Sequence, residues 1–236
     1  MWFVVKYRKN KKGEISMITY NDIKHNEKIR AYIKKADESL LALGFTEHGF
    51  AHVTLVAERA GKILQALGYD EKTIELAKIS AFMHDIGNIV NRREHSQSGA
   101  VMAFRILDNL NLEPNDIADI VTAIGNHDEG TGEAVNPISA SLIIADKTDV
   151  RRTRVRVKPT DASFDIHDRV NYSVYESHLD VDKEAKTITL CLKIDTEISD
   201  VMSYFEIFTE RMLMCKKAAN TLGTHFKLTI NEQTIM

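Results

Sequence analysis

The feature that most constrains this chain is the pair His84-Asp85, which lies inside an apolar stretch from Ala81 to Gly87. Adjacent histidine and aspartate side chains are costly to bury unless another group neutralises them. A divalent metal ion does so, because an imidazole nitrogen and a carboxylate oxygen can bind the same ion. The second oxygen of Asp85 could reach another ion. The pair therefore predicts a metal site around which the fold is built.

Further residues of ligand type occur on both sides of the pair. In chain order, the six candidate metal ligands are His52, His84, Asp85, His95, His127 and Asp146. The spacing from His52 to His84 equals that from His95 to His127, and each interval has room for parts of two helices and a turn. We therefore expect the ligands to project from several helices into one core, as in bundles that bind metals.

The ligand types also indicate which ions bind. A set of imidazoles and carboxylates suits iron, manganese, cobalt, nickel or zinc better than calcium or magnesium, and without thiolates it is unlike a structural zinc site. We expect two divalent transition-metal ions, with Asp85 as the bridge and with His84 and Asp85 at the catalytic centre. If His95 and His127 are instead solvent-facing residues at helix ends, one ion is expected.

Five short segments contain these residues in a recognisable order. They are His52-Val53-Thr54-Leu55-Val56-Ala57, Phe82-Met83-His84-Asp85-Ile86-Gly87, His95-Ser96-Gln97-Ser98-Gly99-Ala100, Ala123-Ile124-Gly125-Asn126-His127 and Ile143-Ile144-Ala145-Asp146-Lys147. Together they resemble the HD-domain superfamily of metal-dependent phosphohydrolases, over roughly residues 21–157. The two additional histidines resemble its two-metal branch, and the surrounding segments look most like the bacterial HD hydrolases that split dinucleoside tetraphosphates.

One position departs from that resemblance. Many HD proteins continue the pair as His-Asp-x-Gly-Lys, whereas this chain has Asn88 in place of the lysine. The basic run 151–158, which follows Asp146, could supply the missing positive charge, or it could be a solvated helix end. The predicted substrate-binding residues are Arg151, Arg152, Lys147 and Arg92.

The resemblance implies a phosphohydrolase that cleaves a phosphoester or phosphoanhydride bond with metal-activated water. The expected substrate is a nucleotide or a related small phosphorylated molecule. Two alternatives stay open. The same ligand order resembles the di-iron HD oxygenases, which an anaerobic assay would distinguish from a hydrolase. The site could also sense a nucleotide without turnover.

Composition limits the other function classes. A formal net charge of −3 gives no basic field for nucleic acid. No apolar run approaches the length of a membrane span. The two cysteines, Cys191 and Cys215, predict free thiols in a reducing compartment. We therefore expect a cytoplasmic protein that binds neither membranes nor nucleic acid, with a homodimer as an open alternative.

The pattern of periodicity and helix caps predicts a mainly α fold. Residues 1–20 are expected to form a hairpin or an extension, and Met17 could be an alternative start. Residues 21–158 are expected to form an HD-type helical bundle carrying the metal site. Residues 159–236 are expected to form a small α+β appendage of order β-β-α-β, with strands at 169–178, 186–195 and 225–231 and a helix at 199–221.

Overall fold

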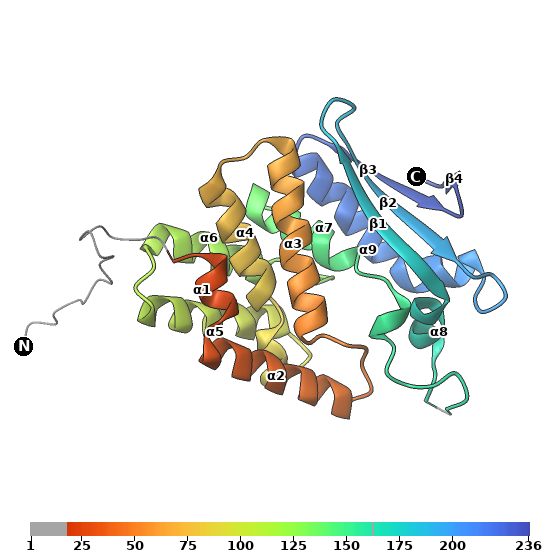
Figure 1. Ribbon diagram of the computed structural model, residues 1–236, viewed down its shortest axis with the longest axis horizontal. Helices are drawn as coiled ribbons and strands as arrows, with labels where there is room; N and C mark the ends of the chain where they lie inside the picture. The colour runs from red at the N-terminus through yellow and green to blue at the C-terminus, as the bar shows by residue number, and fades with distance from the viewer. Residues whose placement is uncertain (1–17, 162) are drawn as a thin grey trace, which may run out of the picture.

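The computed structural model describes residues 18–161 and 163–236. The described chain is a helical bundle followed by a four-stranded sheet, with a long helix between sheet and bundle (Figure 1). This confirms the predicted mainly α fold with a small α+β unit. Most of the predicted N-terminal hairpin, including Met17, lies outside the described residues. No helix in the described ranges is both long and apolar enough to span a membrane.

Asn21-Asp22 as a cap and Gly44 as a stop predict a single helix over 21–43, but the bundle begins there with two helices. These are α1 (Tyr20–Lys24) and α2 (Glu27–Ala42). The break occurs because the side chain of Asn26 accepts hydrogen bonds from the backbone nitrogens of Lys28 and Ile29, at 3.0 and 3.3 Å. An asparagine in this position caps a new helix rather than continuing the previous one.

The helices that carry most of the predicted ligands follow the expected caps. They are α3 (Phe50–Leu67), α4 (Glu71–Met83), α5 (His95–Asn109), α6 (Pro114–Gly125) and α7 (Pro137–Lys147). Gly68 ends α3 in the left-handed conformation, and the Asp70 side chain caps α4 by accepting from the backbone nitrogen of Thr73 at 3.1 Å. Pro114 and Pro137 occupy first helical positions, where a missing N–H costs nothing.

The turn after α4 differs from what the sequence pattern predicts. The cap at Asp70 and the apolar positions after it predict one helix that ends at Gly87, but α4 ends at Met83 and a 3₁₀ helix, η1 (Ile86–Ile89), follows. A Cβ atom on Gly87 would lie 2.0 Å from the carbonyl oxygen of His95 and 2.4 Å from the backbone nitrogen of Gly99. Only glycine allows this approach, which brings the start of α5 against the His84-Asp85 turn.

The C-terminal segment begins with two short helices and continues with the sheet. Its elements are η2 (Arg152–Arg154), α8 (Ile166–Ser173), β1 (Val174–Asp182), β2 (Thr187–Ile194), α9 (Val201–Thr221), β3 (His225–Ile230) and β4 (Gln233–Thr234). The first half of the predicted strand 169–178 is wrong, because the Asp165 side chain accepts from the backbone nitrogen of Asp168 at 3.0 Å and caps α8 there.

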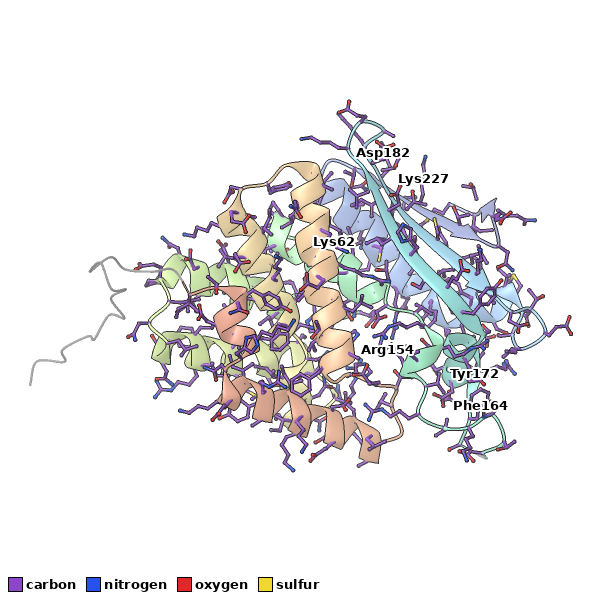
Figure 2. All side chains as sticks on the ribbon, viewed as in Figure 1. Lys62, Arg154, Phe164, Tyr172, Asp182 and Lys227 are labelled. Atoms are coloured by element: carbon purple, nitrogen blue, oxygen red, sulfur yellow. The ribbon has the colours of Figure 1, made fainter. Side chains whose placement is uncertain are left out.

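The sheet has the strand order β1-β2-β3-β4. Strands β1 and β2 pair antiparallel. Strands β2 and β3 pair parallel, because the intervening α9 returns the chain to the end of the sheet at which β2 begins. Helix α9 packs against β3 on one side and α7 on the other. Arg154 lies where the bundle meets this segment (Figure 2), and its Nε donates to the carbonyl oxygen of Glu47 at 2.9 Å. The C-terminal segment thus packs, through α9, against α7, the helix that carries Asp146.

Candidate metal centre

The fold brings all six predicted ligands into one cluster. His52 lies on α3, His84 caps α4, Asp85 follows it, His95 opens α5, His127 follows α6 and Asp146 lies on α7. Five of the six are buried, and the Asp146 side chain is 12% exposed. Their possible ligand atoms form three overlapping groups, within each of which all the atoms lie within 4.8 Å of one another.

One group surrounds His52. Its Nε2 lies 3.3 Å from His84 Nε2, 3.3 Å from Asp146 Oδ1 and 3.5 Å from Asp85 Oδ2. Asp85 Oδ2 in turn lies 3.2 Å from His84 Nε2. Two imidazole nitrogens and two carboxylate oxygens therefore face a common point.

A second group shares Asp85 through its other oxygen. Asp85 Oδ1 lies 3.3 Å from His95 Nε2, which lies 3.1 Å from His127 Nε2. The two oxygens of one carboxylate thus face two different sets of histidines. This is the arrangement that a bridging ligand between two ions requires.

The histidine rings are held so that they suit a metal. Each of them uses Nδ1 for a hydrogen bond to an oxygen: His52 to Asp149 Oδ2, and the other three to the carbonyl oxygens of Ala81, Arg92 and Ile124, at 2.6–3.0 Å. With Nδ1–H donating, a neutral ring presents the Nε2 lone pair to the cluster. Facing lone pairs repel unless a cation lies between them. Asp85 Oδ2 is also buried with no hydrogen-bond partner in the described chain, so the donor set fits divalent ions.

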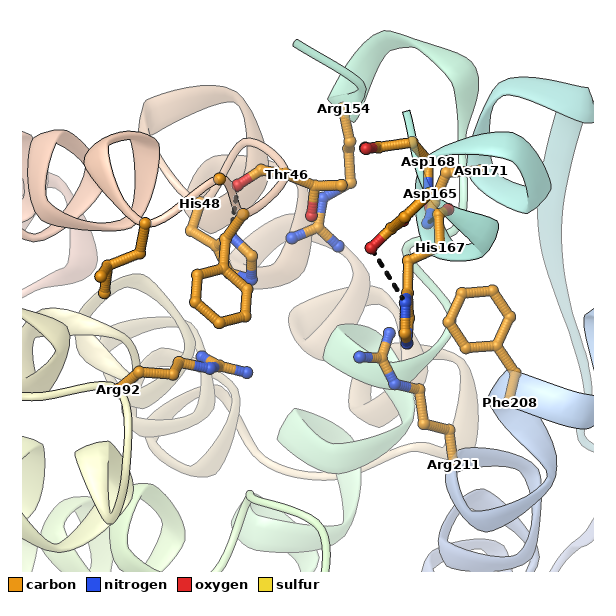
Figure 3. Close-up of a pocket in the computed structure, with 13 residues that line it drawn as sticks. Thr46, His48, Arg92, Arg154, Asp165, His167, Asp168, Asn171, Phe208 and Arg211 are labelled. Atoms are coloured by element: carbon orange, nitrogen blue, oxygen red, sulfur yellow. Dashed lines mark hydrogen bonds and ion pairs between the residues drawn. The ribbon is translucent and has the colours of Figure 1, made fainter. Parts of the chain in front are cut away.

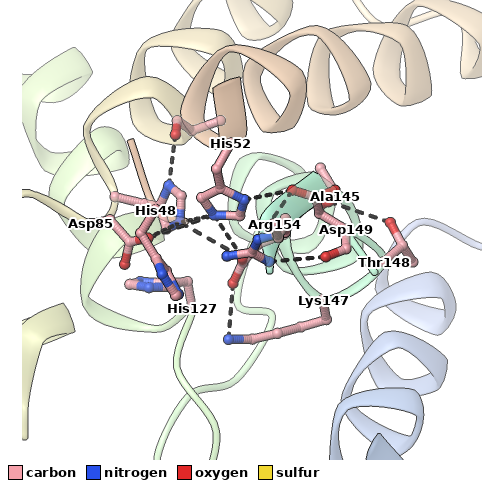
Figure 4. A network of polar contacts seen from close by, with 12 residues as sticks. His48, His52, Asp85, His127, Ala145, Lys147, Thr148, Asp149 and Arg154 are labelled. Carbon is pink, nitrogen blue, oxygen red and sulfur yellow. Dashed lines mark hydrogen bonds and ion pairs between the residues drawn. The ribbon is translucent and has the colours of Figure 1, made fainter. Parts of the chain in front are cut away.

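Two residues hold the cluster from outside. Asp149 Oδ2 accepts from His52 Nδ1 at 2.7 Å, while Asp149 Oδ1 accepts from Arg151 Nε at 2.6 Å (Figure 4). Asn88 Nδ2 donates to Asp85 Oδ1 at 2.9 Å, and its own Oδ1 accepts from Arg92 Nη1 at 3.3 Å. Asn88 therefore orients the shared carboxylate, and Arg92 contributes the positive charge nearby.

Charges in the cluster shift the pKa of His84. Burial opposes its protonation, but the carboxylates of Asp85 and Asp146 outweigh burial and raise the pKa to about 10. Burial alone would raise the pKa of Asp85, yet His84 and His95 hold it well below its usual range. In the metal-free protein near neutral pH, His84 is therefore an imidazolium that occupies the position of a cation.

This charge state predicts that metal binding releases protons. A divalent ion needs the His84 Nε2 lone pair, so the ion must displace the proton at any pH below about 10, and affinity should rise with pH over that range. Calorimetric titration of Mn²⁺ at pH 7.5, in buffers of different ionisation enthalpy, should give release of about one proton per chain or more. Binding without proton release would contradict this assignment of His84.

A small pocket of about 20 Å³ opens on the cluster, beside a larger cavity of about 350 Å³ (Figure 3). The two have four lining residues in common: His48, Arg92, Arg154 and Arg211. The three guanidinium groups converge from η1–α5, η2 and α9, and we call them the arginine collar. Lys147 lines the small pocket, with its Nζ 2.9 Å from Asp146 Oδ2.

The predicted substrate-binding residues divide into two pairs. Arg92 and Lys147 line the small pocket, whereas Arg151 and Arg152 line neither cavity. Arg151 is held by Asp149, and Arg152 lies over the ring of Tyr172, with its Nε donating to the carbonyl oxygen of Tyr172 at 2.5 Å. Arg151 is therefore paired with the residue that holds His52, and Arg152 packs against the C-terminal segment.

Sequence reasoning missed three residues of the pocket. Arg154 belongs to the basic run but was not distinguished from its neighbours. The spacing of residues in a 3₁₀ turn does not reveal the direction in which each side chain points. His48 was not among the predicted site residues, because its place four residues before His52 left a role beside the site and a surface position equally open. Arg211 comes from α9, far from every ligand in sequence, and only tertiary packing brings it to the cluster.

Comparison with known families identifies the segment that builds the cluster. The family model of the HD domain matches residues 49–153, which include all six clustered residues. The part of the chain that builds the cluster is thus similar to the HD domain. Arg211 and helix α8 lie outside the matched segment, so one wall of the larger cavity comes from the rest of the chain.

Two other comparisons give distant relatives. An uncharacterized protein of Methanocaldococcus jannaschii is 27% identical over 176 residues, which cover 65% of this chain and 67% of that protein. The crystal structure of a predicted HD superfamily hydrolase from an uncultured Thermotogales bacterium is similar at 24% identity, with a TM-score of 0.43, over 54% of this chain and 69% of that one.

Proposed function

We propose that this protein is a metal-dependent phosphohydrolase that cleaves a phosphoester or phosphoanhydride bond of a small phosphorylated molecule, with a nucleotide as the expected substrate. The observation that carries the proposal is the arginine collar at the mouth of a cluster in which Asp85 faces two sets of histidines. An anion entering from the larger cavity meets three guanidinium groups before it reaches the cluster.

The six clustered residues would hold two divalent transition-metal ions. When bound, such ions lower the pKa of water and withdraw charge from phosphoryl oxygens. His52, His84, Asp85 and Asp146 would hold one ion, and Asp85, His95 and His127 the other. The Lys147 ammonium, which also pairs with Glu129 and Asp128, lies 2.9 Å from Oδ2 of Asp146, and Oδ1 of Asp146 faces His52.

The collar would bind the phosphoryl group and orient it. Guanidinium groups suit this task because they donate in a planar fork and stay charged at every relevant pH. Arg154 is fixed by bonds to the carbonyl oxygens of Glu47 and Asp149, both at 2.9 Å, so its charge is held at the cavity without rearrangement. Such preorganised charge stabilises a phosphoryl group more effectively than mobile side chains do.

Metal analysis and a substrate screen test the proposal together. Protein purified without chelator should contain transition metal, and with Mn²⁺ or Fe²⁺ it should release phosphate from at least one compound in a panel of nucleotides and sugar phosphates. Phosphate release should persist without O₂, whereas the reaction of an oxygenase would stop. Tight nucleotide binding with no turnover under any metal would favour the sensing alternative.

The collar predicts a specific kinetic defect. Because a hydrogen bond to a charged group contributes about 1.5–3 kcal/mol, Arg211→Gln should lower kcat/KM roughly ten- to a hundredfold. Metal content should not change, since Arg211 is not among the clustered ligands. The matched control is Arg105→Gln, an exposed arginine on α5 that pairs with Asp108.

The same experiment separates the collar from the basic run. Arg151→Gln and Arg152→Gln test the two substrate-binding residues that the sequence favoured. A large loss of kcat/KM in either of them, with wild-type kinetics in Arg211→Gln, would assign phosphate binding to the basic run and would contradict the collar.

A further inference from the structure

The wall of the larger cavity that α8 forms is chemically unlike the collar. Asp165, Asp168 and Asn171 line it, so carboxylate and amide groups share the cavity with the arginine collar, of which Arg92 lies farthest from α8 (Figure 3). A ligand in this cavity therefore meets both positive and negative groups. Helix α8 lies after the segment matched by the HD domain, so this wall is a property of the C-terminal segment.

Asp168 is the informative residue in this wall. It is only 6% exposed. Its own backbone nitrogen donates to Asp165 Oδ1 at 3.0 Å, and the backbone N–H of Asp165 donates in return to the Asp168 carboxylate, which fixes the first turn of α8. Burial, with the nearby charge of Asp165, still raises the pKa of Asp168. One backbone donor leaves most acceptor sites of a carboxylate unfilled, and buried acceptor sites are costly unless further donors meet them.

Asn171 extends the same acceptor surface. It is also 6% exposed, and its Nδ2 donates to the carbonyl oxygen of His167 at 2.8 Å, one helical turn earlier. That bond uses the amide nitrogen and leaves Oδ1 as an acceptor. Asp168 and Asn171 lie three residues apart on one helix face, so both can meet the same ligand group.

The size of the cavity limits what reaches this wall. A volume of about 350 Å³ is near the lower end of ligand pockets, which usually run from about 300 to 1,000 Å³. One phosphate held by the collar leaves room for a single small organic group. That group would lie against α8.

Resting on the proposed function, we propose that α8 is the specificity element of the site. Through Asp168 and Asn171 it selects phosphate esters whose organic part carries hydrogen-bond donors, either hydroxyl groups, as in a sugar, or an ammonium group. Esters with an apolar organic part leave the remaining acceptor sites of the Asp168 carboxylate without a donor and bind less well.

Binding and turnover of three esters test this inference separately. The probes are ribose 5-phosphate, phosphoethanolamine and phenyl phosphate, with Mn²⁺-loaded protein. Binding is measured by calorimetry at low temperature, with phosphate release followed in parallel. We expect one donor-bearing ester to bind at least about tenfold more tightly than phenyl phosphate, and Asp168→Ala to reduce that preference to about twofold or less.

Matched variants identify which donor group of the ligand is recognised, and they control for loss of the fold. Asp168→Asn keeps an acceptor but removes the charge, so it should weaken an ammonium ligand more than a hydroxyl ligand. Asn171→Ala is an independent second variant, expected to reduce the same preference. Asp180→Asn, on the exposed strand β1, is the control for loss of a carboxylate.

The outcomes separate this inference from the proposed function. Phenyl phosphate binding as tightly as both other esters, or a preference unchanged in Asp168→Ala and Asn171→Ala, overturns the role of α8, whatever the turnover. If binding depends on Asp168 but no phosphate is released, the role of α8 in selectivity is supported, and only the proposed hydrolase activity is contradicted.

Discussion

Asp85→Ala is expected to reduce phosphate release at least about a thousandfold, because charge stabilisation by metals is worth several kcal/mol and each 1.36 kcal/mol is tenfold in rate. Asp85 is the only residue whose two oxygens face both sets of histidines in the described chain. Its removal therefore weakens both candidate ion sites at once. Initial rates of phosphate release on the best substrate of the screen measure the effect.

The fold should survive this change. The core around the cluster is apolar and independent of Asp85, with Phe82, Met83 and Ile86 buried beside it. Removing one partner of a buried ion pair is destabilising when it leaves the other charge unpaired. Here His84 keeps Asp146 as a partner, 3.7 Å from its Nε2, and it can also lose its proton. Circular dichroism and a cooperative thermal transition should confirm folding. A folded variant with wild-type turnover would contradict the role of Asp85.

Asn88→Ala offers a graded version of the same test. It leaves both carboxylate oxygens in place but removes the bond from Asn88 Nδ2 to Asp85 Oδ1, so the carboxylate is held less well. Loss of such an outer partner usually costs about 10–100-fold in metal affinity or activity. An effect between wild type and Asp85→Ala is the result expected of a bridging carboxylate.

The sequence predicted the cluster better than the pocket for a physical reason. A metal site needs rare ligand types inside apolar helices, and burying them elsewhere would be costly, so His84 and Asp85 stand out against their neighbours. The helix caps at Asp70, Pro114 and Pro137 are local signals of the same kind, because one side chain determines the backbone there.

Substrate-binding residues lack such local signals. An arginine is favourable on any surface, so nothing in sequence separates Arg154, which faces the cavity, from Arg152, which packs on Tyr172. The direction of each depends on a 3₁₀ turn whose geometry the spacing does not reveal. Arg211 and Asp168 reach the cavity only because α8 and α9 pack against the bundle. Long-range packing of this kind leaves no periodic trace in the sequence.

The wild-type protein is expected to bind two ions per chain, and His127→Ala is expected to bind one. Among the described residues, the group of Asp85, His95 and His127 offers three candidate ligands, so removing His127 leaves two, which is a poor site for a transition metal. The other group keeps both histidines and both carboxylates. Elemental analysis after loading with Mn²⁺ or Fe²⁺ and dialysis gives the stoichiometry directly.

A matched control makes this count decisive. His178→Ala removes an exposed histidine from strand β1, far in sequence from the cluster, and should retain two ions. His52→Ala should lose the other ion, because His52 Nε2 lies within 3.5 Å of His84, Asp85 and Asp146 ligand atoms. If wild type and His127→Ala both bind one ion, His95 and His127 are not ligands. The activity then belongs to a one-metal site, in which Asp85 uses Oδ2 alone and Arg92, beside Oδ1, holds the position of the second cation.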